Sequence, residues 1–173
     1  IIRPRYNSKI NNLKNKILKE IKKFRLNKMF LHIEFKINDK GDIEIIEINP
    51  RLAGGFIPIL IKEATNLDLI DFYLEQITKN IEHKIKKKKI VKFYKIIFLI
   101  PPRPQKVKYI KFSNKIKNIV INKKLYFDKI KNFKNYNYDF TDRLGHLIFK
   151  SKNMQKLKIL EQNIRSSVKF VYK

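Results

Sequence analysis

Residues 31–58 read LHIEFKINDKGDIEIIEINPRLAGGFIP, and this stretch decides the fold. An alternating segment at residues 30–37 is followed by the turn signal NDKG at 38–41 and by a β-rich run at 42–48. Two β runs that are joined by a short turn containing Gly predict an antiparallel hairpin.

The length of the turn predicts the register of this hairpin. A turn at residues 38–41 places Ile37 opposite Asp42 and Glu34 opposite Ile45, and side chains alternate between the two faces along each strand. One face is then mostly polar, and the other is purely apolar and belongs to the core. The first face carries His32, Glu34, Ile45, Glu47 and Asn49, and the second carries Ile33, Phe35, Ile46 and Ile48.

Two carboxylates on the polar face suggest a metal site. In this register Glu34 and Glu47 are diagonal neighbours with Cα atoms roughly 7–8 Å apart, and a hard cation with oxygen ligands at about 2.0–2.1 Å can bridge them. Asn49 adds a neutral oxygen on the same face. The alternative is that both carboxylates face solvent or pair with Lys, which is abundant in this chain.

The segment PRLAGG at residues 50–55 favours binding of an anion. Gly54 and Gly55 allow backbone N–H groups to approach a ligand closely, and Arg51 stands two residues beyond Asn49. A metal, an Arg and a Gly-rich backbone together suit phosphate or carboxylate. The alternative for the two Gly residues is a plain loop before a helix.

The order of these residues resembles a known signature. Glu34, followed by EINPR at residues 47–51, resembles the metal-binding signature of the ATP-grasp superfamily. The extension LAGGFIP at residues 52–58 resembles the carboxylate–amine ligases that are related to the L-amino acid ligases. The resemblance implies an ADP-forming ligase in which ATP phosphorylates a carboxylate and an amine attacks the acyl phosphate, giving an amide or peptide bond.

The resemblance also implies the site residues. It implies Mg²⁺ or Mn²⁺ as cofactor with ATP as co-substrate, and small acids and amines as the remaining partners. Arg51 is the expected catalytic residue on the acyl phosphate. The expected metal ligands are Glu34, Glu47 and Asn49, and the expected substrate contacts are Gly54, Gly55 and His32.

The second half of the chain resembles the same ligases. IPPRP at residues 100–104 and DRLG at 142–145 match segments of their C-terminal subdomain. The expected fold class is therefore α+β: the C-terminal half of an ATP-grasp fold, an antiparallel sheet with flanking helices, followed by a small α+β subdomain. We expect residues 1–83 to carry the metal hairpin and residues 84–173 to form the subdomain.

Apolar periodicity and turn signals predict the remaining elements. Asn66 is expected to end one helix in a left-handed conformation and Asp68 to cap the next, while Asp142 and Arg143 are expected to be structural and His146 to be in packing or on the surface. Helices are expected at 8–24, 58–64, 69–79 and 153–168, strands at 91–100, 107–112, 116–121 and 124–127, and a charged linker at 82–89.

The net charge of +26 suggests nucleic-acid binding, but the composition argues against it. The basic residues are 34 Lys and 7 Arg, and Lys, Ile and Asn together are what A/T-rich codons encode. Because Arg is the usual residue for base and bidentate phosphate recognition, we expect no specific nucleic-acid binding. The absence of Cys excludes disulfides and thiolate zinc sites. The sequence has no run of about 20 apolar residues, so we expect no membrane span. These features fit a cytoplasmic protein.

The resemblance covers only the C-terminal part of such an enzyme. Three interpretations remain open: a fragment, a split subunit that needs a separate chain for the N-terminal half, or an inactive relic. A basic nucleic-acid-binding protein is the alternative from another functional class, and its binding would survive Glu47→Gln.

Overall fold

The structure is a computed structural model, and it describes residues 8–26, 29–40, 42–79, 90, 92–103, 105–126, 130 and 140–173. The chain divides into two compact units, one within residues 4–90 and the other within residues 91–173. The boundary expected at residues 83–84, the linker at 82–89 and His83 lie outside the described residues. No helix in the described part of the chain combines the length and the apolar character that a bilayer crossing requires.

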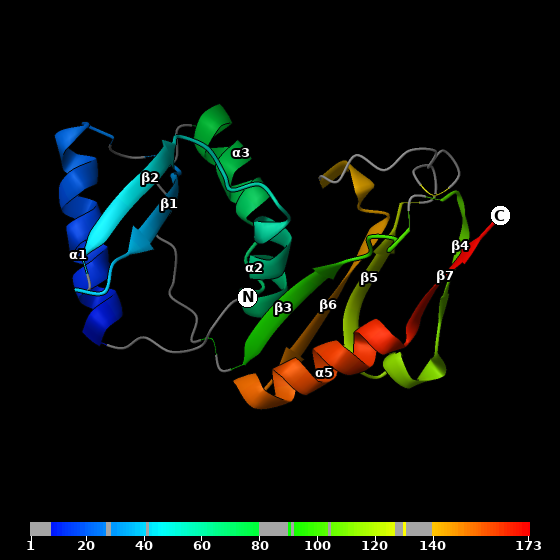
Figure 1. The fold of residues 1–173 in the computed structure, drawn as a ribbon. Helices are drawn as coiled ribbons and strands as arrows, with labels where there is room; N and C mark the ends of the chain where they lie inside the picture. Colours follow the sequence, from blue (N-terminus) through cyan, green and yellow to red (C-terminus); the bar gives the residue numbers. More distant parts are fainter. Residues whose placement is uncertain are drawn as a thin grey trace. The chain divides into compact units, whose positions relative to one another are not determined.

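The described part of the N-terminal unit contains one hairpin and three helices (Figure 1). Their order along the chain is α1 (Ser8–Lys23), β1 (His32–Ile37), β2 (Ile43–Asn49), α2 (Ile57–Thr65) and α3 (Leu69–Lys79). β1 and β2 pair in antiparallel fashion, as the sequence predicts.

α1, whose sequence carries an apolar stripe, lies beside β2 (Figure 1). Ile21 on this stripe is buried, whereas Phe24, which was expected to continue it, lies beyond the end of the helix and is exposed. Lys16 Nζ lies 2.7 Å from Asp42 Oδ1 at the start of β2. The hydrogen bond and charge of Lys16 lower the pKa of Asp42, so this pair links the helix to the hairpin.

α2 ends on the expected left-handed cap. Asn66 has a φ of 57°, and its backbone N–H donates to the carbonyl of Lys62 at 2.7 Å. Asn tolerates this left-handed conformation better than most residues because its short polar side chain can hydrogen-bond locally. Pro58 stands in the first turn, where a missing N–H costs nothing.

α3 begins at a capped residue, also as expected. Asp68 Oδ1 accepts the backbone N–H of Ile70 at 3.0 Å, and Asp68 Oδ2 lies 2.5 Å from Lys62 Nζ. The apolar face of this helix is open on one side, since Ile70, Leu74 and Ile77 are 47%, 52% and 61% exposed.

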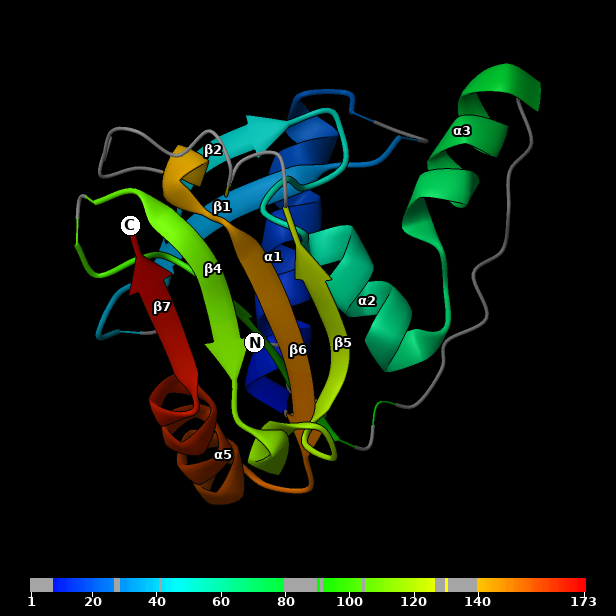
Figure 2. The same ribbon diagram turned by 90° about the vertical axis from the view of Figure 1, so that its right-hand side faces the viewer.

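In the described residues, the C-terminal unit has two small antiparallel sheets and one long helix (Figures 1 and 2). One sheet has the order β3-β6-β5 and the other pairs β4 with β7. The elements are β3 (Phe93–Phe98), β4 (Val107–Phe112), η1 (Asn114–Ile116), β5 (Val120–Leu125), η2 (Phe140–Asp142), β6 (Gly145–Ser151), α5 (Met154–Ser166) and β7 (Val168–Tyr172). The expected α+β class with antiparallel sheets and flanking helices is confirmed.

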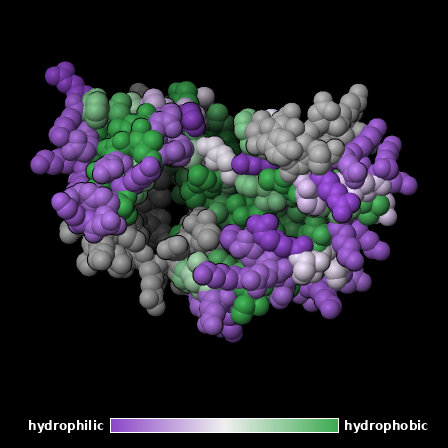
Figure 3. All heavy atoms as spheres, in the orientation of Figure 1, coloured by the Kyte–Doolittle hydropathy of each residue, from purple (hydrophilic) through white to green (hydrophobic). Residues whose placement is uncertain are grey.

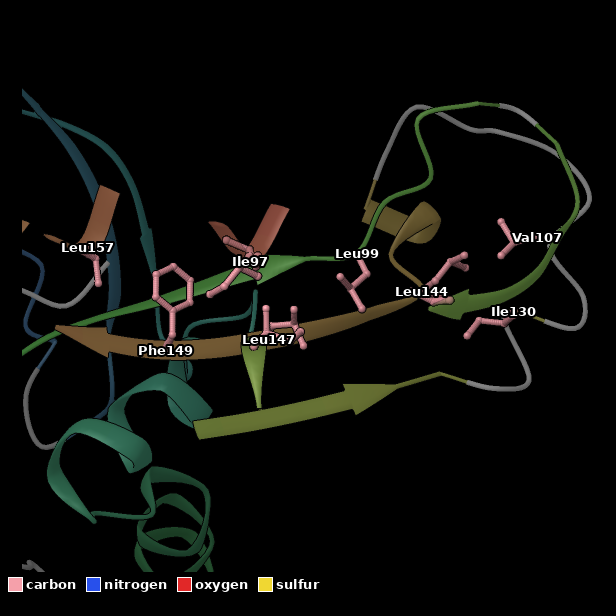
Figure 4. Close-up of a cluster of buried hydrophobic side chains, with 11 residues drawn as sticks. Ile97, Leu99, Val107, Ile130, Leu144, Leu147, Phe149 and Leu157 are labelled. Atoms are coloured by element: carbon pink, nitrogen blue, oxygen red, sulfur yellow. The ribbon is translucent and has the colours of Figure 1, made fainter. Parts of the chain in front are cut away.

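The core of this unit is centred on β6 (Figure 4). Leu147 and Phe149 of that strand point into this core, and both have an exposure of 0%. Leu157 and Ile164 of α5 are equally buried. Burial of such side chains stabilises by roughly 1.5–3 kcal/mol each, which makes β6 and α5 the main source of stability here.

Three expectations for this half were wrong. Residues 116–121 and 124–126 do not form two separate strands, because η1 and a turn precede the single strand β5 (Val120–Leu125). The last helix ends at Ser166 instead of 168, and β7, which was not expected, follows it. Val168 fits the apolar period of the helix as well as the alternation of VKFVY at 168–172, and pairing with β4 decides for the strand.

The turn into β6 explains the DRLG segment. A Cβ on Gly145 would lie 2.4 Å from the carbonyl oxygen of Lys124 on β5, so the two strands can approach only with Gly there. The guanidinium of Arg143 lies 3.9 Å from the ring centroid of Phe98, which is a structural contact. His146 is 1% exposed, and its expected packing role is confirmed in preference to a surface position.

The surface carries hydrophilic side chains on both units (Figure 3). On the visible face they are spread over several elements instead of forming one stripe. This distribution agrees with a Lys excess that is mainly compositional.

Candidate functional site

The hairpin turn is one residue longer than predicted. The N–H of Asn38 donates to the carbonyl of Asp42 at 3.0 Å, and the N–H of Asp42 donates to Asn38 Oδ1 at 2.8 Å. Ile37 therefore pairs with Ile43, not with Asp42. The predicted register was wrong because the Asn38 side chain closes a wider turn than the NDKG signal indicates.

A β-bulge shifts the register a second time. The pairing changes between Glu34 and Phe35, so Phe35 lies opposite Ile45 while Glu34 lies opposite Glu47. Ile46 is the extra residue and is 58% exposed instead of lying in the core. A bulge leaves one residue unpaired and reverses the alternation beyond it.

The bulge sorts the side chains of β2 more cleanly than the predicted register did. Ile45, expected on the polar face, joins the apolar face with Phe35. The signal for this was present in the sequence, since the consecutive residues Ile45 and Ile46 break an otherwise regular polar–apolar alternation. Sequence reasoning missed it by assuming an unbroken period of two.

The polar face of the hairpin is made of three directly opposed pairs. These pairs are His32 with Asn49, Glu34 with Glu47, and Lys36 with Glu44. Cβ atoms of directly opposed residues lie about 4.5–5.5 Å apart, and like charges in this arrangement are destabilising. The Lys36–Glu44 pair is attractive, whereas the Glu34–Glu47 pair is repulsive.

No basic side chain among the described residues neutralises the two carboxylates. Neither Glu34 nor Glu47 has a Lys or Arg nitrogen within 4.0 Å in that part of the chain. The nearest titratable partner is His32, whose Nε2 lies 3.8 Å from Glu34 Oε1. Although the protein has 41 Lys and Arg residues, none of those in the described part of the chain forms an ion pair with either of these carboxylates.

Two buried nitrogen atoms lie next to this pair without a hydrogen-bond partner. They are Nδ1 of His32 and Nδ2 of Asn49, on residues that face each other across the strands. A buried polar group without a partner costs about 1–3 kcal/mol. The end of the hairpin is therefore polar, partly enclosed and incompletely satisfied by the described residues.

Arg51 is brought to the strand end by a tight turn at Pro50. Its backbone N–H donates to the carbonyl of Asn49 at 2.8 Å, a three-residue turn. Its Nη1 donates to the carbonyl of Leu52 at 3.0 Å, and the side chain is exposed. A guanidinium has five N–H donors, so this single bond leaves most of them available.

The two glycines form an open turn before α2. The carbonyl of Gly54 accepts the N–H of Ile57 at 3.2 Å, while Gly55 and Phe56 both have positive φ, 62° and 66°. A Cβ on either Gly would meet no atom within 4 Å. Among the described residues no acceptor binds the N–H of Gly54 or Gly55, so both donors are available to a ligand.

The oxygen atoms of Glu34, Glu47 and Asn49 are of the kind that a hard divalent cation prefers, and two of these three residues are charged. No group of three or more His, Asp and Glu side chains gathers as a metal site in the described part of the chain. Glu34 and Glu47 would supply carboxylate oxygens and Asn49 an amide oxygen, and magnesium sites commonly combine one or two carboxylates with substrate phosphates.

Comparison with known proteins identifies the architecture. Residues 4–59, which contain the whole hairpin, match the model of the ATP-grasp domain. The chain superimposes over its full length on phosphoribosylglycinamide synthetase from Anaerococcus prevotii, with a TM-score of 0.74 and 18% identity. It has an ATP-grasp fold. The resemblance inferred from the sequence is thereby confirmed at the level of the fold.

Two other solved structures have the same fold. L-amino acid ligase from Bacillus licheniformis gives a TM-score of 0.72 at 11% identity over 99% of this chain. N5-carboxyaminoimidazole ribonucleotide synthetase from Thermotoga maritima gives 0.66 at 14% identity over 98%. No curated protein sequence matches the chain. At 11–18% identity, the likeness to these three structures is one of fold.

The chain spans less than half of these structures. It covers 44%, 43% and 44% of their respective chains. This is consistent with the expected C-terminal portion of an ATP-grasp ligase.

Proposed function

We propose that this chain is the catalytic C-terminal part of an ADP-forming ATP-grasp ligase that joins a carboxylate to an amine. The observation that carries the proposal is the direct opposition of Glu34 and Glu47 with no basic partner among the described side chains. Without a cation, two carboxylates in this position repel each other and destabilise the hairpin. A cation between them would remove this repulsion.

Glu34, Glu47 and Asn49 would hold Mg²⁺ or Mn²⁺. When bound, such an ion neutralises charge on the phosphates of ATP, which is its usual contribution to phosphoryl transfer. An ion held by these residues would replace the mutual repulsion of the two carboxylates with attraction, and two carboxylates with one amide oxygen would leave room for phosphate oxygens.

Arg51 would bind the transferred phosphoryl group. Its guanidinium is exposed and uses one of its N–H groups on the Leu52 carbonyl, so a planar donor pair remains for two phosphate oxygens. The tight turn at Pro50 keeps it close to Asn49. The role that we assign is electrostatic stabilisation of charge that develops as the acyl phosphate forms.

Gly54, Gly55 and His32 would contact the substrate. The N–H groups of the two glycines are open, and a side chain at either position would narrow the approach. Backbone donors of this kind bind carboxylate well. His32 carries a buried, unpartnered Nδ1 beside the carboxylate pair, which suits a hydrogen bond to a bound ligand.

A separate chain would supply the rest of the grasp in the split-subunit interpretation. The chain spans less than half of the similar structures, and Ile70, Leu74 and Ile77 at helical spacing on α3 are exposed. An apolar stripe of this type favours a protein partner over water.

An enzyme that uses ATP and small acids in this way would work in the cytoplasm.

The test is calorimetric titration of Mg²⁺·ATP into the purified chain, alone and together with a polypeptide that supplies the remaining part of the fold. Glu47→Gln removes the proposed ligand, and Glu44→Gln is the matched control because it removes one carboxylate from the same strand and face. We expect binding that is lost in Glu47→Gln and kept in Glu44→Gln. Binding that is kept in Glu47→Gln would refute the proposed metal ligand, and no binding by the wild-type chain in either arm would refute the proposal and favour an inactive relic.

A further inference from the structure

A second candidate site lies in the C-terminal unit, away from the hairpin residues. A pocket of about 680 Å³ opens between the β4–β7 pair, the loop after β4 and the C-terminal end of α5. Figure 2 shows β4 and β7 side by side and the end of α5 leading directly into β7. Every lining residue belongs to this one unit and to the described part of the chain. Its size falls within the roughly 300–1,000 Å³ range of small-molecule sites.

The pocket is lined by a repulsive pair of lysines. Lys111 on β4 lies directly opposite Lys169 on β7, and both line the pocket together with Lys115. Like charges directly opposed on neighbouring strands are destabilising. No carboxylate lines the pocket, and within the described residues none of the three lysines forms an ion pair.

The end of α5 does not account for these positive charges. A helix C-terminus is equivalent to roughly −0.5 elementary charge, which is small beside three lysines. Its carbonyls are also partly used: Ser167 N–H donates to the carbonyls of Asn163 and Ile164, and Ser113 N–H donates to that of Ser167. A positive surplus therefore remains in the pocket.

The other walls suit the body of an organic molecule. Phe112 and Ile119 also line the pocket and provide apolar surface, and Asn163 and Ser166 provide polar groups. Lys123 Nζ lies 4.8 Å from the ring centroid of Phe112 and adds a further charge at the edge. This combination of an apolar wall with clustered ammonium groups favours a ligand that has both an organic part and a strongly anionic group.

We propose that this pocket binds a small organic molecule that carries a phosphate or pyrophosphate group, with Lys111, Lys115 and Lys169 as the anion ligands. Phosphate oxygens between Lys111 and Lys169 convert a repulsive cross-strand pair into two charge-assisted hydrogen bonds. The pocket is independent of the carboxylate pair of the hairpin, so the ligand can be tested without metal.

The test is an amide NMR titration of the full chain with inorganic pyrophosphate in EDTA at roughly 0.15 M ionic strength, where long-range attraction to a basic surface is screened. We expect saturable shifts centred on Ser113, Lys115, Ser166 and Ser167. Glu47→Gln is expected to leave this binding unchanged, so failure of the pocket and failure of the proposed ligase function are separate outcomes.

Two exposed lysines of α5 provide the matched control. The double variant Lys111→Gln/Lys169→Gln should weaken binding by about tenfold or more, because two charge-assisted hydrogen bonds are removed. Lys156→Gln/Lys158→Gln makes the same change in net charge at exposed positions outside the pocket and should alter it by about twofold or less under this screening. The single variant Lys115→Gln tests the third lysine separately and should also weaken pyrophosphate binding.

Three outcomes would overturn the proposal. One is equal weakening in the two double variants, and another is a set of shifts scattered over lysine-rich surface outside the pocket. The third is a single-stranded oligonucleotide that binds the same residues more tightly than pyrophosphate at the same salt, which would assign the lysines to a nucleic-acid backbone instead.

Discussion

Glu34 and Glu47 face each other directly across the β1–β2 ladder, at the bulge formed by Ile46. Without the bulge, the observed turn would place Glu34 opposite Ile46, and Glu47, one residue farther along β2, would point to the other face of the hairpin. The bulge therefore creates the closest approach of negative charge on this hairpin. Arrangements that destabilise the protein but concentrate ligand atoms are typical of binding sites.

The first prediction is that Glu47→Gln stabilises the metal-free chain. Removing one charge of the opposed pair relieves repulsion of about 0.2–1 kcal/mol. Urea denaturation in EDTA measures the change in the free energy of unfolding. Glu44→Gln is the control, because it breaks the attractive pairing with Lys36 and should be neutral or destabilising. If the two variants shift stability equally and in the same direction, repulsion between Glu34 and Glu47 is not the cause.

The second prediction concerns Glu161, which joins α5 to β3. Its carboxylate contacts Lys95 and also Arg165, whose Nη2 lies at 2.9 Å. Burial opposes ionisation, but the hydrogen bonds and charges of Lys95 and Arg165 outweigh it and hold the pKa of Glu161 below its usual value. Glu161→Gln should cost on the order of 1–2 kcal/mol at neutral pH, as for hydrogen bonds to a charged group.

The pH dependence of this contribution has a definite sign. Because the pKa of Glu161 is lower in the folded state, its stabilisation is complete above the usual glutamate value near 4.5 and is lost as the pH falls through the folded pKa. Thermal melts of wild type and Glu161→Gln should therefore converge in acid. The exposed Glu20–Lys23 pair is the control, and Glu20→Gln should change stability by less than about 0.5 kcal/mol.

The third prediction concerns the close approach of β5 and β6. Gly145→Ala places a methyl group 2.4 Å from the carbonyl oxygen of Lys124, and the backbone of a central sheet must move to accept it. We expect a loss of about 1–3 kcal/mol, as for other overpacked sites. Gly54→Ala has open space and no positive φ and should fold normally. Equal stability of both variants would contradict the account of the DRLG turn.

The fourth prediction concerns His146, which is buried on β6. Burial lowers the pKa of His146, and the charge of Lys124 lowers it further. A hydrogen bond joins its Nδ1 to Tyr126 Oη at 2.9 Å. The folded protein binds this proton less readily than the unfolded chain, so stability should fall as the pH falls below the unfolded value of about 6.5.

His146→Gln removes the titrating group and should flatten this part of the pH profile. Tyr126→Phe is the companion variant, because it deletes the hydrogen bond and keeps the imidazole. It should lower stability but retain the slope. A slope that persists unchanged in His146→Gln would assign the pH dependence to another group.

Local sequence signals were sufficient for most helices and for the hairpin itself. Asn66, Asp68 and the apolar periods of α1 and α3 depend on neighbours within a few residues, and such signals can be read without a tertiary structure. The resemblance that rested on Glu34 and EINPR led to the correct fold. These features are local or carried by a compact motif.

The errors arose where distant contacts decide between two local possibilities. The residues at 168–172 continue an apolar helical period and also alternate, and only pairing with β4 makes them a strand. The register of the hairpin depended on a side-chain hydrogen bond of Asn38 and on a bulge at Ile46. The lysine pocket could not be predicted, because Lys111 and Lys169 are far apart in sequence and meet only through β4 and β7.

The central claim is that Glu34 and Glu47 hold a divalent cation together. Its most direct test is an amide NMR titration with Mn²⁺ in the absence of nucleotide, where a bound paramagnetic ion broadens the signals of nearby residues. The account predicts selective, saturable broadening at Glu34, Glu47 and Asn49, reversed by EDTA, lost in Glu47→Gln and retained in Glu44→Gln. Broadening that is absent from the hairpin, or unchanged in Glu47→Gln, would contradict it.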